Sequence, residues 1–142
     1  MARALEQARQ AARQGEVPVG AVLADAQGQI LAAAHNLTRS SHDPTAHAEI
    51  LAIRAAAEIL HSERLSGCTL TVTLEPCAMC AAAIAEARIA RLVYAAPDPK
   101  GGAVEHGARI FRHSHHKPEI ISGIAEQPAA ALLRDFFRDR RP

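Results

Sequence analysis

Near the middle of the chain, the sequence reads Leu70-Thr-Val-Thr-Leu-Glu-Pro-Cys-Ala-Met-Cys80. Thr alternates with apolar residues over 70–74, which predicts a strand with one buried face. Pro76 then favours the opening of a helix, which we expect over 77–87. Because a strand that passes directly into a helix is typical of α/β proteins, this segment indicates the fold class.

The rest of the chain continues the alternation of strands and helices. Periodicity, turn residues and possible caps predict seven further elements and one helical turn: helices over 2–14, 46–61 and 129–140, strands over 17–23, 29–34, 89–95 and 119–124, and a turn near 105–112. Pro18 suggests an edge strand or the first residues of a strand. Thr45 is a candidate N-cap for the second helix. The whole pattern predicts an α/β sandwich.

Length and composition bound the function. The chain has 142 residues and a mass of 15.1 kDa, which predicts one domain over 1–142. Its formal charge of +1 argues against a uniformly basic nucleic-acid coat, and 3% aromatic residues are too few for a broad base-stacking platform. Residues 100–142 nevertheless hold eight Lys and Arg against five Asp and Glu. Candidates for phosphate contacts there are Lys100, Arg138, Arg140 and Arg141.

The sequence also bounds the compartment. No stretch reaches the ~18 apolar residues that a membrane span needs, and the N-terminal residues do not resemble a targeting signal. We therefore expect a cytoplasmic protein with no membrane partner, in which thiols stay reduced. Three cysteines are an odd number and too few for a disulfide scaffold, so we expect them to be metal ligands, catalytic groups or buried core residues rather than cross-links.

Three residues have the character of zinc ligands. Cys77 and Cys80 are three apart, so both thiols can lie on one face of the predicted helix. His47, at the start of another predicted helix, supplies a third ligand. Three protein ligands leave the fourth tetrahedral position open to water, which is the arrangement of catalytic zinc rather than structural zinc. Free N–H groups at both helix starts favour the thiolate that zinc requires.

Glu49 follows His47 by two positions. Side chains two apart on a helix point about 200° apart, so Glu49 should not bind the metal that His47 holds. It can still reach a water at the metal from the side. We therefore expect Glu49 to be the general base and then the general acid of a hydrolytic reaction.

Each motif has a less specific interpretation when it is considered alone. Cys-x-x-Cys also suits a redox pair, and a single His at a helix start is more often a cap or a solvated residue. The combination is more specific. His-x-Glu, then about 30 residues, then Pro-Cys-x-x-Cys matches the signature of zinc nucleobase deaminases.

At these residues the chain resembles the bacterial tRNA-specific adenosine deaminases of the cytidine deaminase-like superfamily. The matching stretches cover nearly the whole chain: 16–22, 43–50, 70–80, 98–103 and 132–138. The resemblance implies a three-layer α/β/α sandwich around a mixed, mainly five-stranded sheet. It also implies a homodimer, with one Zn²⁺ per subunit, that converts the wobble adenosine of a tRNA anticodon stem-loop to inosine.

The resemblance further implies roles for particular residues. Zinc would be bound by His47, Cys77 and Cys80, and Glu49 would transfer protons. Asn36 would read the bound base. Contacts with the anticodon stem-loop would come from a loop and from the C-terminal helix: Asp98, Lys100, Gly101, Gly102, Phe136, Phe137 and Arg138.

Two other functions compete with this one. A free-base or nucleoside deaminase acting on guanine, cytosine or cytidine would use the same zinc site. A zinc-stabilised RNA-binding protein without catalysis would bind tRNA and release no ammonia, but it would have no use for Glu49 beside the metal. His113, His115 and His116 are expected in a solvated loop rather than at a second metal.

Overall fold

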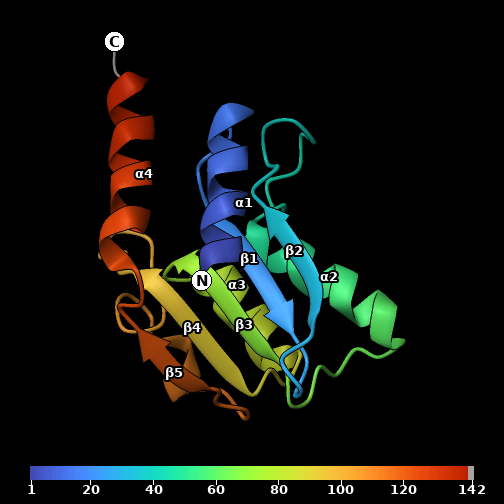
Figure 1. Ribbon diagram of the computed structural model, residues 1–142. Helices are drawn as coiled ribbons and strands as arrows, with labels where there is room; N and C mark the ends of the chain where they lie inside the picture. The colour runs from blue at the N-terminus through green and yellow to red at the C-terminus, as the bar shows by residue number, and fades with distance from the viewer. Residues whose placement is uncertain (141–142) are drawn as a thin grey trace.

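The computed structural model describes residues 1–140 and shows a central sheet with helices on both faces (Figure 1). Arg141 lies outside the described residues. The elements follow in chain order: α1 Ala2–Arg13, β1 Gly20–Ala24, β2 Ile30–His35, α2 Ala48–Leu60, β3 Thr69–Leu74, α3 Ala78–Glu86, β4 Arg91–Ala96, the 3₁₀ turn η1 Ile110–Arg112, β5 Glu119–Ser122 and α4 Glu126–Asp139.

The sheet is mixed and has the strand order β2-β1-β3-β4-β5. β1 pairs antiparallel with both β2 and β3, whereas β3, β4 and β5 run parallel. Helices α1 and α4 cover one face, and α2 and α3 cover the other (Figure 1). The predicted three-layer α/β/α sandwich around a five-stranded sheet is confirmed.

Two elements, one strand and one helix, begin three residues away from the predicted position, and the other strand and helix boundaries agree within two residues. β1 begins at Gly20 and lies inside the sheet, so Pro18 precedes the strand and neither occupies an edge nor removes a hydrogen bond from the ladder. α4 begins at Glu126, three residues before the prediction. Pro128 fits within its first turn because the N–H groups there have no partner inside the helix.

Small residues let α1 lie directly on the sheet. Ala4, Ala8 and Ala11 are fully buried on its inner face. A Cβ added to Gly20 on β1 would come within 2.0 Å of the Ala4 carbonyl oxygen, so only glycine fits at that contact. Small side chains on α1 and β1 therefore allow close packing between these two layers.

The topology places four strand termini along one edge of the sheet, namely the start of β1 and the ends of β2, β3 and β4. β3 and β4 are parallel, so both end there, and the antiparallel pairing of β1 with β2 and β3 places the start of β1 and the end of β2 at the same edge. The segments that follow His35, Leu74 and Ala96 therefore lie close together. Within residues 1–140, no helix is both long and apolar enough to cross a membrane.

Candidate active site

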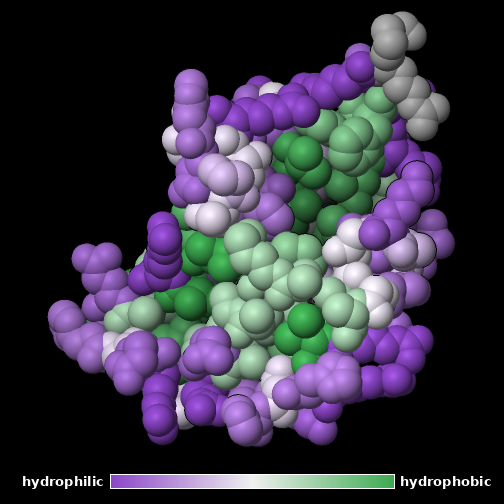
Figure 2. Space-filling view, turned by 180° about the vertical axis from the view of Figure 1, so that it is seen from behind, coloured by the Kyte–Doolittle hydropathy of each residue, from purple (hydrophilic) through white to green (hydrophobic). Residues whose placement is uncertain are grey.

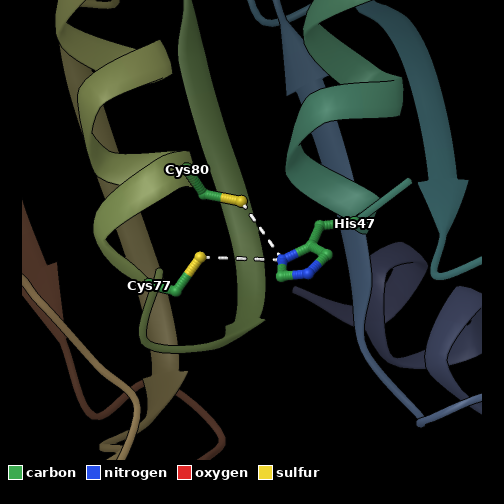
Figure 3. Close-up of side chains that lie close together, drawn as sticks. All are labelled: His47, Cys77 and Cys80. Atoms are coloured by element: carbon green, nitrogen blue, oxygen red, sulfur yellow. Dashed lines mark hydrogen bonds between the residues drawn. The ribbon is translucent and has the colours of Figure 1, made fainter. Parts of the chain in front are cut away.

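The three predicted metal ligands meet at this edge of the sheet (Figure 3). His47 Nδ1 lies 3.7 Å from Cys77 Sγ and 3.5 Å from Cys80 Sγ. The three ligand atoms all lie within 4.8 Å of one another. Zinc bond lengths in a tetrahedral site place a sulfur and a nitrogen ligand about 3.6 Å apart. Both the donor set and its spacing therefore fit zinc.

Two helix starts hold these ligands. His47 is the N-cap of α2 and Cys77 is the N-cap of α3, and neither side chain caps its own helix. Both side chains are thus free to point toward each other across the gap between the helices (Figure 3). The exposed N–H groups at a helix start stabilise negative charge, which favours a thiolate at Cys77.

Asn36 replaces the missing cap of α2. Its Oδ1 accepts a hydrogen bond of 2.8 Å from the Ala48 N–H, directly after the ligand His47. Thr45, the predicted cap, instead donates its hydroxyl to Asp43 Oδ1 at 2.7 Å, so that prediction is wrong. A residue after β2 therefore fixes the start of the helix that carries His47, which a local reading of the sequence could not find.

The environment of the two cysteines separates their acidities. The pKa of Cys77 is lowered to about 4, mainly by the hydrogen bond that the Cys80 thiol donates to it. Burial raises the pKa of Cys77, but a hydrogen bond from His47 lowers it further. Donating its hydrogen bond to Cys77, together with burial, raises the pKa of Cys80. The hydrogen bond to Cys77 raises the pKa of His47. The group thus holds a thiolate at neutral pH before any metal adds its own charge.

Glu49 lies in the first turn of α2 and outside the group of ligand atoms, as expected from its spacing. Its side chain is almost fully buried. Burial raises the pKa of Glu49 to about 7. A carboxyl group with this pKa can both accept and donate a proton near neutral pH, which is the requirement for a general acid and base.

A pocket of about 330 Å³ opens over the ligands. Its walls include His47 and Cys77, the carboxyl group of Glu49, the amide of Asn36 and the loop residues Asp98 and Gly101, together with Val17, Val19, Thr38, Leu74 and Glu75. Apolar residues and a few convergent polar groups are typical of a small-molecule site. Four predicted site residues outside the metal group, namely Asn36, Glu49, Asp98 and Gly101, thus border the same space.

The loop after β4 is built around its own polar groups. Asp98 Oδ1 accepts hydrogen bonds from the N–H of Lys100 at 3.2 Å and of Gly101 at 2.9 Å. Gly102 is buried, and an added Cβ there would come within 2.5 Å of Glu75 Cδ. Lys100 is exposed at the tip. The four predicted loop residues therefore differ in exposure, and Gly102 does not border the pocket.

A larger groove joins the pocket on the side of α4. Its volume is about 940 Å³, and it shares Val17, Leu74, Asp98 and Gly101 with the pocket. Its remaining walls include three cationic side chains and two apolar ones: Arg39, Lys100, Arg140, Leu133 and Phe137. Figure 1 shows α4 projecting beyond the sheet on this side. The groove gives a long molecule a path into the pocket.

The three predicted residues of α4 have three different surroundings. Phe137 is 48% exposed and lines the groove. Phe136 is buried beneath Arg140, whose guanidinium carbon lies 3.7 Å from the ring centroid, and it does not line the groove. Arg138 pairs with Asp135 at 3.2 Å and with Asp139 at 3.7 Å, outside the groove.

Arg39 was not predicted as a site residue. The fully buried carboxylate of Glu16 holds its segment by accepting the N–H groups of Arg39 at 3.1 Å and Ser40 at 2.7 Å. The Arg39 guanidinium carbon lies 5.8 Å from the Phe136 ring, on the groove wall. The sequence offered one signal for the role of Glu16, which is its charge at a position between Gly15 and the apolar run that follows.

The histidines of the loop before β5 do not form a second centre. His116 Nε2 lies 2.6 Å from the Ile89 carbonyl oxygen, whereas His113 and His115 are exposed. Among residues 1–140, the one group of metal-ligand type is His47, Cys77 and Cys80. The expectation of a largely solvated loop agrees with this placement.

Comparison with known proteins connects this geometry to a family. A family model described as the cytidine and deoxycytidylate deaminase zinc-binding region matches residues 1–96. A tRNA-specific adenosine deaminase of Agrobacterium fabrum is 55% identical over 143 residues, which cover 99% of this chain and 93% of the relative. The match thus extends well beyond the zinc ligands.

Two solved structures share the fold. One comes from studies of A-to-I editing by tRNA:A34 deaminases at the wobble position of transfer RNA. It superposes with a TM-score of 0.92 at 55% identity, over 94% of this chain and 97% of that one. A guanine deaminase from Nitrosomonas europaea superposes with a TM-score of 0.83 at 25% identity, over 95% of this chain and 81% of that one.

Proposed function

The chain belongs to the cytidine and deoxycytidylate deaminase family, among its tRNA-specific adenosine deaminases, and we propose on that premise that it hydrolyses the wobble adenosine of a tRNA anticodon to inosine. The full-length similarity to a tRNA-specific adenosine deaminase carries this conclusion. The guanine deaminase is a more distant relative, so free-base deamination is the less supported alternative. The protein is accordingly a tRNA-processing hydrolase with a zinc-binding deaminase domain.

The proposed reaction adds water to adenine and releases ammonia. Zinc held by His47, Cys77 and Cys80 would supply a Lewis acid that activates water at neutral pH. Glu49 accepts a proton from the attacking water as the oxygen bonds to C6. Glu49 passes this proton to N1, then accepts the second proton from the hydroxyl group now on C6 and passes it to the departing amine. The C6 oxygen becomes a carbonyl as the C6–N6 bond breaks and ammonia leaves. Inosine remains, and Glu49 returns to its starting state.

Asn36 is proposed to orient the base. Its Oδ1 is committed to the Ala48 N–H, which leaves the Nδ2 amide group as the donor available to the pocket. An adenine flipped into the pocket presents ring-nitrogen acceptors. The same side chain would thus position both the base and, through α2, the segment that carries His47 and Glu49.

The RNA strand is proposed to follow the groove. The loop residues Asp98, Lys100 and Gly101 would contact the nucleotide at the pocket mouth, while Gly102 allows the loop to pack closely behind them. Phe137 offers an exposed ring for stacking against a flanking base. Phe136 would act indirectly, by supporting Arg140. Arg138 would contact phosphate outside the groove.

This path predicts unequal effects for two arginines. We expect Arg39→Gln to weaken binding of an anticodon stem-loop and to reduce the salt slope of log K by about 0.7 to 1, the loss of one phosphate contact. Arg138→Gln should have the smaller effect because Asp135 and Asp139 already pair with that guanidinium. Stem-loop affinity measured over a series of salt concentrations tests this. An Arg138 effect equal to or larger than that of Arg39 would contradict it.

The assembly proposed here is one deaminase domain over residues 1–142, acting in the cytoplasm as a homodimer with one Zn²⁺ per subunit. An apolar area lies on the face that carries α2 and α3 (Figure 2). The exposed residues of α3 include Ala78, Ala82 and Met79, the last 36% exposed. Small side chains on an exposed helix permit a close approach by a second copy, which supports this face as the dimer contact.

One assay decides between the proposed functions. The cognate tRNA is incubated with the zinc-loaded protein and sequenced, and we expect the wobble position to change from A to G in the read. Ammonia release from free guanine, cytosine, cytidine and adenosine is measured in parallel and should be negligible. Activity on the small molecules alone would favour the free-base alternative. Binding of tRNA with no ammonia released from any substrate would favour a non-catalytic RNA-binding protein.

A further inference from the structure

A second buried carboxyl group borders the active-site pocket and has no part in the proposed chemistry. Glu75 follows β3 and precedes Pro76, so it comes two residues before the ligand Cys77. It is 2% exposed. A buried carboxylate is costly unless hydrogen bonds satisfy its oxygens, so its partners show what it stabilises.

All the hydrogen-bond partners of the Glu75 carboxylate come from the loop after β4, whereas its backbone N–H donates to the Ala96 carbonyl oxygen at the end of β4. Oε2 accepts the N–H groups of Val104 at 3.1 Å, Glu105 at 2.9 Å and His106 at 3.1 Å. Oε1 accepts the Asp98 N–H at 3.0 Å and lies 2.7 Å from His106 Nδ1. One carboxylate therefore binds the two ends of the segment 98–106 and draws it into a closed loop.

The segment closed in this way forms part of the proposed substrate wall. Asp98 and Gly101 line the pocket, and Lys100 lines the adjoining groove. Gly102 touches the carboxylate so closely that an added Cβ would lie 2.5 Å from Glu75 Cδ. The Ala103 N–H also donates to the Pro76 carbonyl oxygen at 2.9 Å. The loop is thus attached to the same segment that leads into the zinc-ligand helix α3.

We propose that Glu75 is a positioning residue, which sets the distance between the substrate loop 98–106 and the zinc centre. This inference rests on the proposed function, because it assigns the loop to the nucleotide being deaminated. Asp98 lies two residues after the end of β4. Its N–H donates to Glu75 Oε1, and this hydrogen bond ties the start of the loop to the residue that follows β3. Without that bond, the wall formed by Asp98 and Gly101 would move relative to Cys77 and its zinc.

The variant Glu75→Gln tests this proposal with almost no change in volume. An amide keeps one oxygen for the three N–H donors at Oε2, but its NH₂ group would then face the Asp98 N–H, donor against donor. We expect faster hydrogen–deuterium exchange in a peptide covering 98–106, a KM for the stem-loop raised about tenfold, and kcat changed by less than about threefold, the size of effect that one lost buried hydrogen bond produces. Zinc content should stay at the wild-type value.

Two further variants complete the test. Glu119→Gln makes the same chemical change at an exposed residue, paired with Arg91, at the other end of the sheet, and it should leave exchange, KM and kcat unchanged. Gly102→Ala keeps the Glu75 side chain but forces the loop and the carboxylate apart, and we expect the same rise in KM and in exchange. If Glu75→Gln does not fold, the Gly102→Ala variant tests whether displacement of the loop raises KM.

The outcomes separate this proposal from the proposed function. KM is measured with whichever nucleobase substrate the wild-type protein deaminates, so a wrong substrate assignment does not alter the comparison. Unchanged exchange over 98–106 and unchanged KM in a folded Glu75→Gln variant would overturn the proposal. Loss of zinc from that variant would also overturn it, because Glu75 would then act on the metal centre rather than on the loop.

Discussion

Replacing Glu49 with Gln is expected to lower kcat by about 10²–10⁴-fold, the contribution typical of a positioned general acid and base. The amide has nearly the same volume as the carboxyl group but cannot accept a proton from water or return one to the leaving amine. Glu49 lies outside the metal-ligand group, so zinc content should not change. Single-turnover deamination of a tRNA stem-loop, together with metal analysis of the same sample, measures both quantities.

Glu58→Gln is the matched control for this variant. Glu58 lies on the same helix, α2, but is exposed to solvent, so the same substitution there should leave kcat within about twofold of the wild-type value because surface changes of this kind are usually small. Near-normal turnover by a zinc-loaded Glu49→Gln protein would contradict the role given to Glu49. Loss of zinc from that protein would instead identify Glu49 as a metal ligand.

The parts of the molecule that the sequence predicted best depend on local patterns. The strand over Thr69–Leu74 and the helix that begins after Cys77 follow from alternation and from a proline at the boundary. The metal group follows from chemistry, because two thiols on one helical face need a third ligand and His47 is at another predicted helix start. Parallel pairing of β3 with β4 then brings the adjoining loops to one edge, as is usual for α/β sheets.

The hydrogen-bond partners of two buried carboxylates, Glu16 and Glu75, could not be predicted from local sequence patterns. Glu16 and Glu75 each follow or precede apolar residues, which marks them as unusual but does not identify their partners. Glu75 finds its donors 23 to 31 positions away, and Glu16 finds them 23 and 24 positions away. Such partners are specified by the loop paths, which depend on tertiary packing rather than on residue spacing.

The two adjacent phenylalanines of α4 show a different limit of prediction from the sequence. Successive residues on a helix point about 100° apart, so Phe136 and Phe137 cannot face the same surroundings. The sequence shows that one of them should be buried, but the choice depends on where α4 crosses the sheet. In the structure, Phe136 packs beneath Arg140 and Phe137 lines the groove. Of the two rings, Phe137 is therefore the one that α4 exposes in the groove.

The second large effect is expected from Cys77→Ser. Cys77 is the N-cap of α3 with an extended backbone, and serine is among the best N-cap residues, so the substitution should preserve or strengthen the start of the helix. It removes one of the soft ligands that favour zinc. We expect bound zinc to fall well below the wild-type value, and deamination to fall below detection. Metal analysis after dialysis and the tRNA assay test both expectations.

Loss of zinc should also appear in unfolding. A ligand that binds only the folded state stabilises it by about 4 kcal/mol when its free concentration is a thousand times its Kd. Wild-type protein should therefore lose this increment when a chelator is added, whereas Cys77→Ser should show little response. Cys68→Ala is the control, because Cys68 is buried before β3 and is outside the metal group. It should keep its zinc, its activity and its response to chelator. Wild-type zinc content in Cys77→Ser, or zinc loss in Cys68→Ala, would show that the metal is bound elsewhere.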